Sequence, residues 1–178
     1  EQNGYEAVTI EQIAQAAEVG PATVYRSFGT KERIVLWDEY DPLLLQEVSQ
    51  ELETKPLLLA VETALTNALN RVYEADKRRI LRRARLLLSV PSLVAQSALD
   101  SIMLRGALKE IFRTQGQGID DVHSSVFAAV VVSLLNTAVE LWVADNGRAP
   151  LRDWLQQCFA ALEKLPAPNE PTNGSPGR

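Results

Sequence analysis

The side chains best suited to bind an anion lie close together near the N-terminus, in the stretch VGPATVYRSFGTKERI of residues 19–34. Its hydroxyl and cationic side chains include those of Thr23, Tyr25, Arg26, Thr30 and Lys31. Such groups donate hydrogen bonds to phosphate oxygens and to the edges of bases. A ligand could meet all of them only if the local fold places them on one surface.

Two short helices joined by a tight turn are predicted for this region. Thr9 and Gln12 have the spacing of a capping box, which starts a helix at Ile10. After the turn EVG, Pro21 suits the first position of a second helix because its missing N–H is not needed there. Two helices in this arrangement form a helix-turn-helix.

The second helix, residues 21–28, is predicted to have one buried side. Val24 and Phe28, four residues apart, would pack inward. The side chains left facing outward or sideways are those of Ala22, Thr23, Tyr25, Arg26 and Ser27. The second helix of a helix-turn-helix enters the major groove of DNA. Thr30 would cap a third helix, whose N-terminal amides and Lys31 would form a phosphate site.

The stretch GYEAVTIEQIAQAAEVGPATVYRSFGTKERI resembles the DNA-binding module of TetR-type transcriptional regulators, with the usual Gly-Tyr, Thr, Ile-Ala, Thr-Val-Tyr, Phe and Lys in register. The resemblance implies phosphate contacts from Thr9, Thr23, Tyr25 and Lys31. It also implies base or groove contacts from Gly20, Pro21, Ala22 and Arg26. Ser27 departs from the family pattern, which usually has His or Tyr there.

The N-terminal region also differs from the family pattern. The family begins with a further helix that packs under the DNA-binding segment, whereas only EQN precedes Gly4. We expect the sequence to be a truncated or partly ordered version of the native protein. Before Pro56 there are four Lys and Arg residues against eleven Asp and Glu residues, and an acidic segment binds DNA poorly without added basic residues. The alternative is a helix-turn-helix that serves only for packing.

Composition argues against several other classes of function. The 178 residues are 46% hydrophobic and 23% charged, with a net charge of −5, as in a folded chain. His123 and Cys158 are the only residues of their types, so neither a Cys/His metal site nor an internal disulfide is expected. The chain has no Ser-His-Asp spacing and no Gly-rich phosphate loop, so we expect neither enzyme activity nor a cofactor. We expect a cytoplasmic protein, and the longest apolar run, residues 127–135, is too short to span a membrane.

The whole chain shows helical periodicity. Gly and Pro punctuate it, and the segments between them have apolar residues at spacings of three and four. An all-α fold is predicted, with helices over residues 10–17, 21–28, 31–52, 57–74, 77–89, 92–114, 121–145 and 151–165. The predicted domains are a helix-turn-helix DNA-binding domain (residues 1–53), a helical-bundle domain for ligand binding and dimerisation (54–165) and a disordered tail (166–178).

Three further stretches are similar to the TetR-type subgroup with an acyl-CoA-like ligand-binding C-terminal domain, which includes the mycofactocin regulator. They are ERIVLWDEYDPLL, RRILRRARLLLSVPSL and LRDWLQQCFAALEKL. The second stretch belongs to a basic run, residues 77–85. Arg82 and Arg85 would lie on one side of that helix, with Leu88 turned toward the core. This arrangement suits a ligand with phosphates at one end and a hydrocarbon chain at the other. The alternative is a solvated basic face that balances the acidic segment or touches the DNA backbone.

The helix predicted over residues 121–145 has a narrow polar stripe in an otherwise apolar surface. The stripe consists of Ser133, Asn136, Thr137 and Glu140. Buried polar groups need partners, which here could be a ligand, a neighbouring helix or a second subunit. The remaining candidate ligand contacts are Met103, Phe112, Phe127, Val131 and Asn136, for which core packing or a helix–helix seam is the alternative.

The last two predicted helices have more apolar surface than one small core should absorb. The predicted dimer contacts are Val139, Trp142, Trp154, Leu155, Cys158 and Leu162. A four-helix interface across a two-fold axis would place two DNA-binding segments at half-sites about 34–36 Å apart. A homodimer and a palindromic, double-stranded operator are therefore expected.

The predicted function is that of a ligand-responsive repressor. A small hydrophobic effector, such as an acyl-CoA, would favour an arrangement in which the DNA-binding segments no longer match the half-sites. The third helix would transmit the change, with Pro42 as a joint. The alternative is a helical lipid or acyl-CoA carrier, or a scaffold, that has lost DNA binding.

Overall fold

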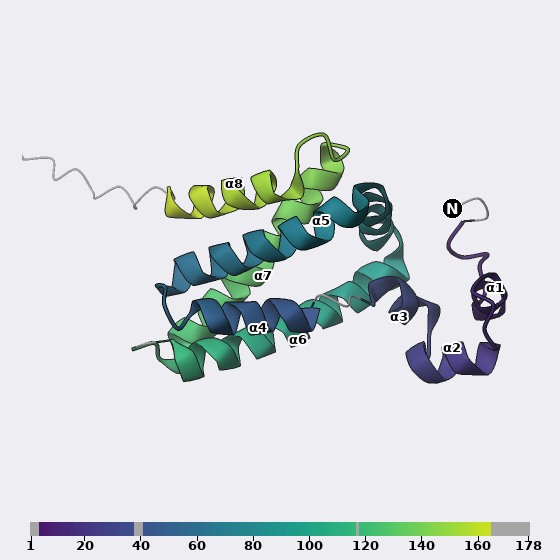
Figure 1. Ribbon diagram of the computed structural model, residues 1–178, viewed down its shortest axis with the longest axis horizontal. Coiled ribbons are helices and arrows are strands. Elements are labelled where there is room, and N and C mark those ends of the chain that lie inside the picture. The colour runs from purple at the N-terminus through teal and green to yellow at the C-terminus, as the bar shows by residue number, and fades with distance from the viewer. Residues whose placement is uncertain (1–3, 38–40, 117, 165–178) are drawn as a thin grey trace, which may run out of the picture.

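The computed structural model describes residues 4–37, 41–116 and 118–164, which form eight helices and no strand. The all-α fold predicted from the sequence is confirmed. The helices are α1 (Ile10–Ala16), α2 (Pro21–Phe28), α3 (Lys31–Leu36), α4 (Asp41–Glu51), α5 (Leu57–Ser89), α6 (Pro91–Gln115), α7 (Asp121–Ala144) and α8 (Leu151–Glu163). Figure 1 shows α1–α3, which we call the head, beside one end of α4–α8, which we call the bundle.

Local sequence signals explain the helices of the head. Thr9 caps α1, and both hydrogen bonds of its capping box with Gln12 are present. Glu18 turns the chain with a φ of 56°, and Pro21 then begins α2. Gly29 ends α2 with a φ of +73°, a conformation that side chains with a Cβ disfavour. These turns set α2 across α1.

Three of the predicted helix spans are wrong. The span predicted over residues 31–52 is two helices, since α3 ends at Leu36 and α4 begins at Asp41. Pro42 lies in the first turn of α4, where a proline is tolerated because no intrahelical N–H is needed. The spans predicted over 57–74 and 77–89 are one helix, α5, because no Gly or Pro interrupts it. The predicted tail, residues 166–178, lies outside the described residues.

The bundle has the larger core. Its most deeply buried side chains include those of Trp142, Phe112, Leu108 and Leu155. Val48 of α4 and Leu52, the residue after this helix, belong to the same core, so α4 packs with the bundle although it precedes the predicted domain boundary at residue 53. The head has a separate small core of Ile10, Ala14 and Val24, packed against Phe28 and Ile34.

Candidate DNA-binding interface

Helix α2 presents a polar face to solvent. Val24 is 6% exposed and packs in the head core, which fixes the rotation of the helix. The exposed residues of α2 include Pro21, Ala22, Thr23, Tyr25 and Arg26. Thr9 and Gly20 are exposed as well. Seven of the eight predicted DNA contacts thus lie on the surface of the head, and Lys31 is only half-exposed. Their roles on DNA stay predictions.

Tyr25 is positioned by a residue that the sequence reasoning missed. Its hydroxyl donates to Glu11 Oε1 at 3.0 Å, which joins α2 to the first turn of α1. This hydrogen bond raises the pKa of Tyr25 above its ordinary value. The pKa of Glu11 is lowered, first by its own backbone N–H and then by Thr9 and Tyr25. A phosphate approaching the Tyr25 hydroxyl would therefore compete with a carboxylate.

Lys31 contacts the backbone of the segment before α1. Its Nζ donates to the carbonyl oxygens of Tyr5 at 3.0 Å, Glu6 at 3.3 Å and Val8 at 3.4 Å. The same ammonium lies 4.3 Å from the centre of the Tyr5 ring, a cation–π contact. Lys31 thus stabilises the N-terminal segment, a role that no local sequence pattern signals. Its predicted phosphate contact stays a prediction.

Tyr5 links the N-terminal segment to α3. Its hydroxyl donates to Glu32 Oε1 at 2.8 Å. Burial and then this hydrogen bond raise the pKa of Tyr5 to about 12. The pKa of Glu32 is lowered, first by its own backbone N–H and then by the Tyr5 hydroxyl. Ser92, at the start of α6, also interacts with both side chains, so this cluster touches the bundle.

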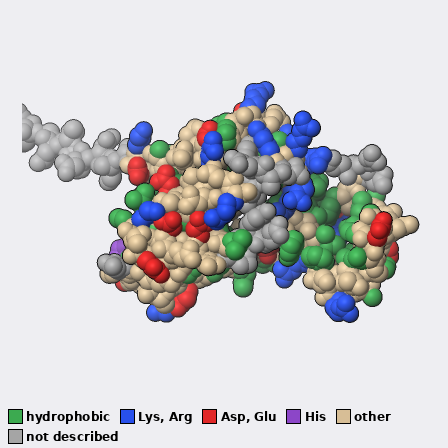
Figure 2. Space-filling view, in the orientation of Figure 1, with side chains coloured by type: hydrophobic (Ala, Val, Ile, Leu, Met, Phe, Trp, Pro, Cys, Tyr) green, Lys and Arg blue, Asp and Glu red, His purple; other side chains and the backbone are tan. Residues whose placement is uncertain are grey.

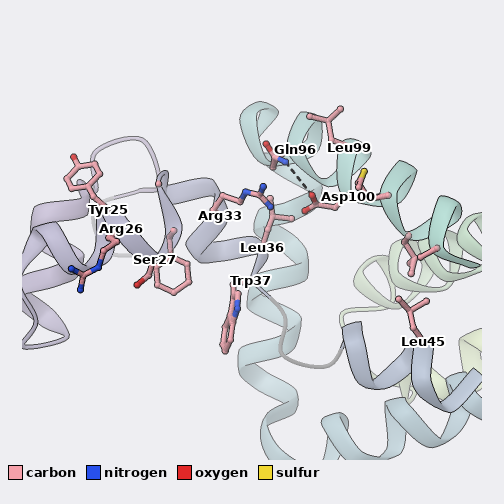
Figure 3. Close-up of a pocket in the computed structure, with 15 residues that line it drawn as sticks. Tyr25, Arg26, Ser27, Arg33, Leu36, Trp37, Leu45, Gln96, Leu99 and Asp100 are labelled. Carbon is pink, nitrogen blue, oxygen red and sulfur yellow. Dashed lines mark hydrogen bonds between the residues drawn. The ribbon is translucent and has the colours of Figure 1, made fainter.

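A cleft of about 1070 Å³ lies between the head and α6. Figure 3 shows Tyr25, Arg26 and Ser27 on its head side, and Gln96, Leu99 and Asp100 on its α6 side. Arg33, Leu36 and Trp37 line the cleft between these two walls. Its wall on α6 also includes Met103, a candidate ligand contact, which is 73% exposed. The cleft therefore separates the exposed face of α2 from the bundle.

Most of the basic run of α5 faces solvent. Figure 2 shows Lys and Arg side chains gathered on the part of the bundle nearest the head. Arg82 and Arg85 are both exposed, and Arg85 Nη2 donates to Asn146 Oδ1 at 3.0 Å. Leu88 is 42% exposed, so the prediction that it turns toward the core is wrong. It lies close to the end of α5, where the chain bends by 99° into α6.

The other candidate ligand contacts do not surround one cavity. Phe112 and Val131 are buried in the bundle core, and the Phe112 and Phe127 ring centres are 5.1 Å apart. Asn136 is exposed and donates to Ser101 Oγ at 3.4 Å. The polar stripe of α7 is therefore not buried, and Ser133, Thr137 and Glu140 are exposed with Asn136. The helix turns its small and apolar side chains inward instead.

The predicted dimer contacts divide into three groups. Trp142 and Leu155 are fully buried in the core of the single chain, so they offer no surface to a partner, contrary to the prediction. An apolar groove of about 430 Å³ lies between α7 and α8. The residues that line it are Leu134, Thr137, Leu141, Gln157, Cys158, Ala161 and Leu162. Val139 and Trp154 are partly buried against the core.

Two family models match the chain. Residues 1–36 match the bacterial regulatory proteins of the tetR family, and residues 55–166 match the MftR C-terminal domain. The chain belongs to the TetR family. Its members are transcriptional regulators, so this chain is a TetR-family transcriptional regulator with a helix-turn-helix head and an MftR-like bundle.

Curated relatives agree with this TetR-family assignment. The chain is 28% identical over 170 residues to the HTH-type transcriptional regulator TcmR of Streptomyces glaucescens, covering 91% of this chain and 70% of that one. It is 25% identical over 147 residues to the putative mycofactocin biosynthesis transcriptional regulator MftR of Mycobacterium tuberculosis, covering 81% and 74%. Each of the two alignments spans more than four fifths of this chain.

A solved TetR-family structure has the same fold. It is Thermus thermophilus FadR, a TetR-family transcriptional repressor, in complex with lauroyl-CoA. The TM-score is 0.59 at 20% identity, with 94% of this chain and 91% of that chain covered. At this identity the likeness shows a common arrangement of helices.

In this TetR-family chain, α7 is long and apolar enough to cross a membrane by length and composition alone, as is the bent pair of helices before it. The sequence did not predict this, because its longest apolar run, residues 127–135, is too short to span a membrane. Core helices of globular proteins meet the same test, and Ala128, Val131 and Trp142 of α7 are buried in the bundle. Across the described ranges, no three His, Cys, Asp or Glu side chains form a metal-binding group.

Proposed function

We propose that this TetR-family regulator is a homodimeric repressor that binds a palindromic operator and releases it when an acyl-CoA-like ligand binds the bundle. The observation that carries the proposal is the exposed face of α2. Val24 holds the helix against α1 and leaves Thr23, Tyr25 and Arg26 exposed on a face that could enter a major groove. The DNA-binding domain would then be the head alone, because α4 packs in the bundle. The domain boundary would lie between α3 and α4 and not at residue 53.

The apolar groove between α7 and α8 supports the dimer. Leu141 is 38% exposed on α7, and Cys158 and Leu162 form the facing wall on α8. An apolar groove on two adjacent helices suits the same groove of a second copy, because a two-fold axis brings equal faces together. The proposed dimer contacts are therefore Leu134, Val139, Leu141, Trp154, Cys158 and Leu162. Trp142 and Leu155 are left out because they are buried in their own chain.

The basic face of α5 supports an anionic ligand. Arg82 and Arg85 are exposed on one helix, where they could pair with the phosphates of a CoA group. Phe112 and Phe127, whose ring centres are 5.1 Å apart, stay the proposed contacts of a hydrocarbon chain. The bound lauroyl-CoA of the similarly folded FadR makes lauroyl-CoA the first probe to use.

Selection of duplex DNA from a randomised library, followed by fluorescence anisotropy, tests the proposal. Arg26→Ala should weaken binding to the selected duplex by about ten- to a hundredfold, as expected for a lost base contact. Arg105→Ala, which removes the same charge from an exposed position on α6, should leave the affinity unchanged. Failure of the wild-type chain to select any duplex, together with binding of lauroyl-CoA, would favour the carrier alternative.

The ligand step has its own test. Lauroyl-CoA should release the selected duplex from the wild-type chain, and the double variant Arg82→Gln, Arg85→Gln should respond less. Release that is equal in the two proteins would show that these arginines do not hold the ligand. If lauroyl-CoA does not weaken DNA binding by the wild-type chain, the repressor proposal stands and the acyl-CoA ligand is rejected.

A further inference from the structure

One arginine of the basic run points to the head and not to solvent. Arg83 is half-buried, its Nε donates to the carbonyl oxygen of Val35 at 2.7 Å, and its Nη2 donates to that of Leu36 at 2.8 Å. Val35 and Leu36 are the last two residues of α3. The last carbonyls of a helix have no intrahelical partner, and a cation there is stabilised by the helix dipole.

Helix α3 connects this contact to the DNA-binding face. Ile34 and Phe28 both pack against the core formed by Val24 and α1. Phe28 also meets the ring of Trp37, with ring centres 6.3 Å apart. A rotation of α3 would therefore move α2 with it, because the two helices share one small core.

The contact lies beside the proposed ligand face. Arg82 and Arg85 flank Arg83 in the sequence and are exposed, whereas Arg83 turns toward the head. Helix α3 also packs against α6, which begins just after α5 ends. Both α5 and α6 therefore hold α3 against the bundle.

We propose that Arg83 is a positioning residue for operator binding, which fixes the orientation of the head on the bundle. In the dimer, this orientation determines the distance between the two α2 helices. The proposal rests on the dimeric repressor proposed above. Arg83 itself does not touch DNA, so its loss should affect the match to half-site spacing more than the affinity of one head for one half-site.

The test uses a palindromic duplex selected by the wild-type chain, variants of it with one or two base pairs added between the half-sites, and a single half-site duplex. Arg83→Met should weaken binding to the selected palindrome by about tenfold, the effect of one or two charge-assisted hydrogen bonds. It should also reduce the preference for the selected spacing. Its affinity for the single half-site should stay within about twofold of wild type.

Two further variants define the effect. Arg83→Lys keeps the charge without the two-pronged geometry, so it should restore part of the spacing preference. Arg105→Met should behave as wild type. Circular dichroism confirms folding, and Arg83→Lys provides the test if Arg83→Met does not fold.

If a folded Arg83→Met protein keeps the spacing preference of the wild type, the proposed role of Arg83 is overturned. The dimeric repressor proposal would not be affected. An equal loss of binding to the single half-site would also overturn this role, because Arg83 would then only support the fold of the head. If the wild-type chain shows no preference for palindromes, the proposal of a dimeric operator is rejected. The proposed role of Arg83 is then rejected with it.

Discussion

The head and the bundle are stabilised by different interactions. The head core consists of Ile10, Ala14 and Val24, and the rest of the head is held by helix caps and hydrogen bonds such as Tyr5–Glu32. Among the side chains that the structure describes, the bundle has eighteen buried in one core. A small core with many polar contacts can open locally, whereas a large apolar core unfolds cooperatively. The DNA-binding part is therefore the part that can most easily change its position.

The two regions also differ in charge. The described residues 4–37 have three Lys and Arg residues against four Asp and Glu residues. Residues 77–85 of α5 have six Lys and Arg residues and no acidic residue. The affinity of the head for DNA must then depend on the placement of Arg26 and of the uncharged hydroxyl donors. The positive potential is stronger at the basic run of the bundle than on the head.

Loss of a bundle core residue should have the largest effect on stability. Trp142→Ala removes a fully buried side chain and should lower the free energy of unfolding by about 3–5 kcal/mol. Val122→Ala, on the same helix at 68% exposure, should change it by less than about 0.5 kcal/mol. Urea titration followed by circular dichroism measures both. Equal effects would mean that the bundle core does not dominate stability.

A backbone change in the head should cost less and act locally. Gly29→Ala forces a side chain into a φ of +73° and should destabilise the head by about 1–3 kcal/mol. An added Cβ would meet no atom within 4 Å, so the cost comes from the backbone alone. Hydrogen exchange should show faster exchange in α2 with the bundle unchanged. Uniformly faster exchange in both regions would mean that they unfold as one unit.

Removal of a helix cap should have a smaller effect. Thr9→Ala removes the side chain that accepts from the Gln12 N–H and should cost about 1 kcal/mol. Thr9→Ser keeps the hydroxyl and should stay near wild type. Hydrogen exchange of α1 amides measures the change, and equal exchange in the two variants would show that the cap contributes nothing.

The smallest effect is expected from the titration of Tyr5. Its pKa is about 12 in the folded chain, above the ordinary value of 10.0, so the folded state keeps this proton longer than the unfolded state. The stability from this group is complete below pH 10 and is lost as the pH rises toward 12. Absorbance titration should show a late-titrating tyrosine component that Tyr5→Phe reduces, with a remainder from Tyr25, whose pKa is also raised. A Tyr5→Phe protein with the same late component would assign it to another tyrosine.

The local structure of the head could be predicted from the sequence. The cap at Thr9, the start of α2 at Pro21, its end at Gly29 and the buried side of Val24 all depend on residues within four positions of one another. The resemblance to the TetR family rested on the same residues and is confirmed by the family models. Contacts between distant residues, such as Tyr25–Glu11 and Lys31–Tyr5, were not predicted.

By itself, the sequence determined the all-α fold, the helix-turn-helix and the exposed face of α2, because short-range spacing and turn residues decide them. Only the tertiary structure decided which side of each bundle helix is buried. Leu88 and Asn136 proved exposed, and Trp142 proved buried in its own chain, since these outcomes depend on the neighbouring helix. It also decided that Arg83 of the basic run donates to the end of α3, 47 and 48 residues away in the chain.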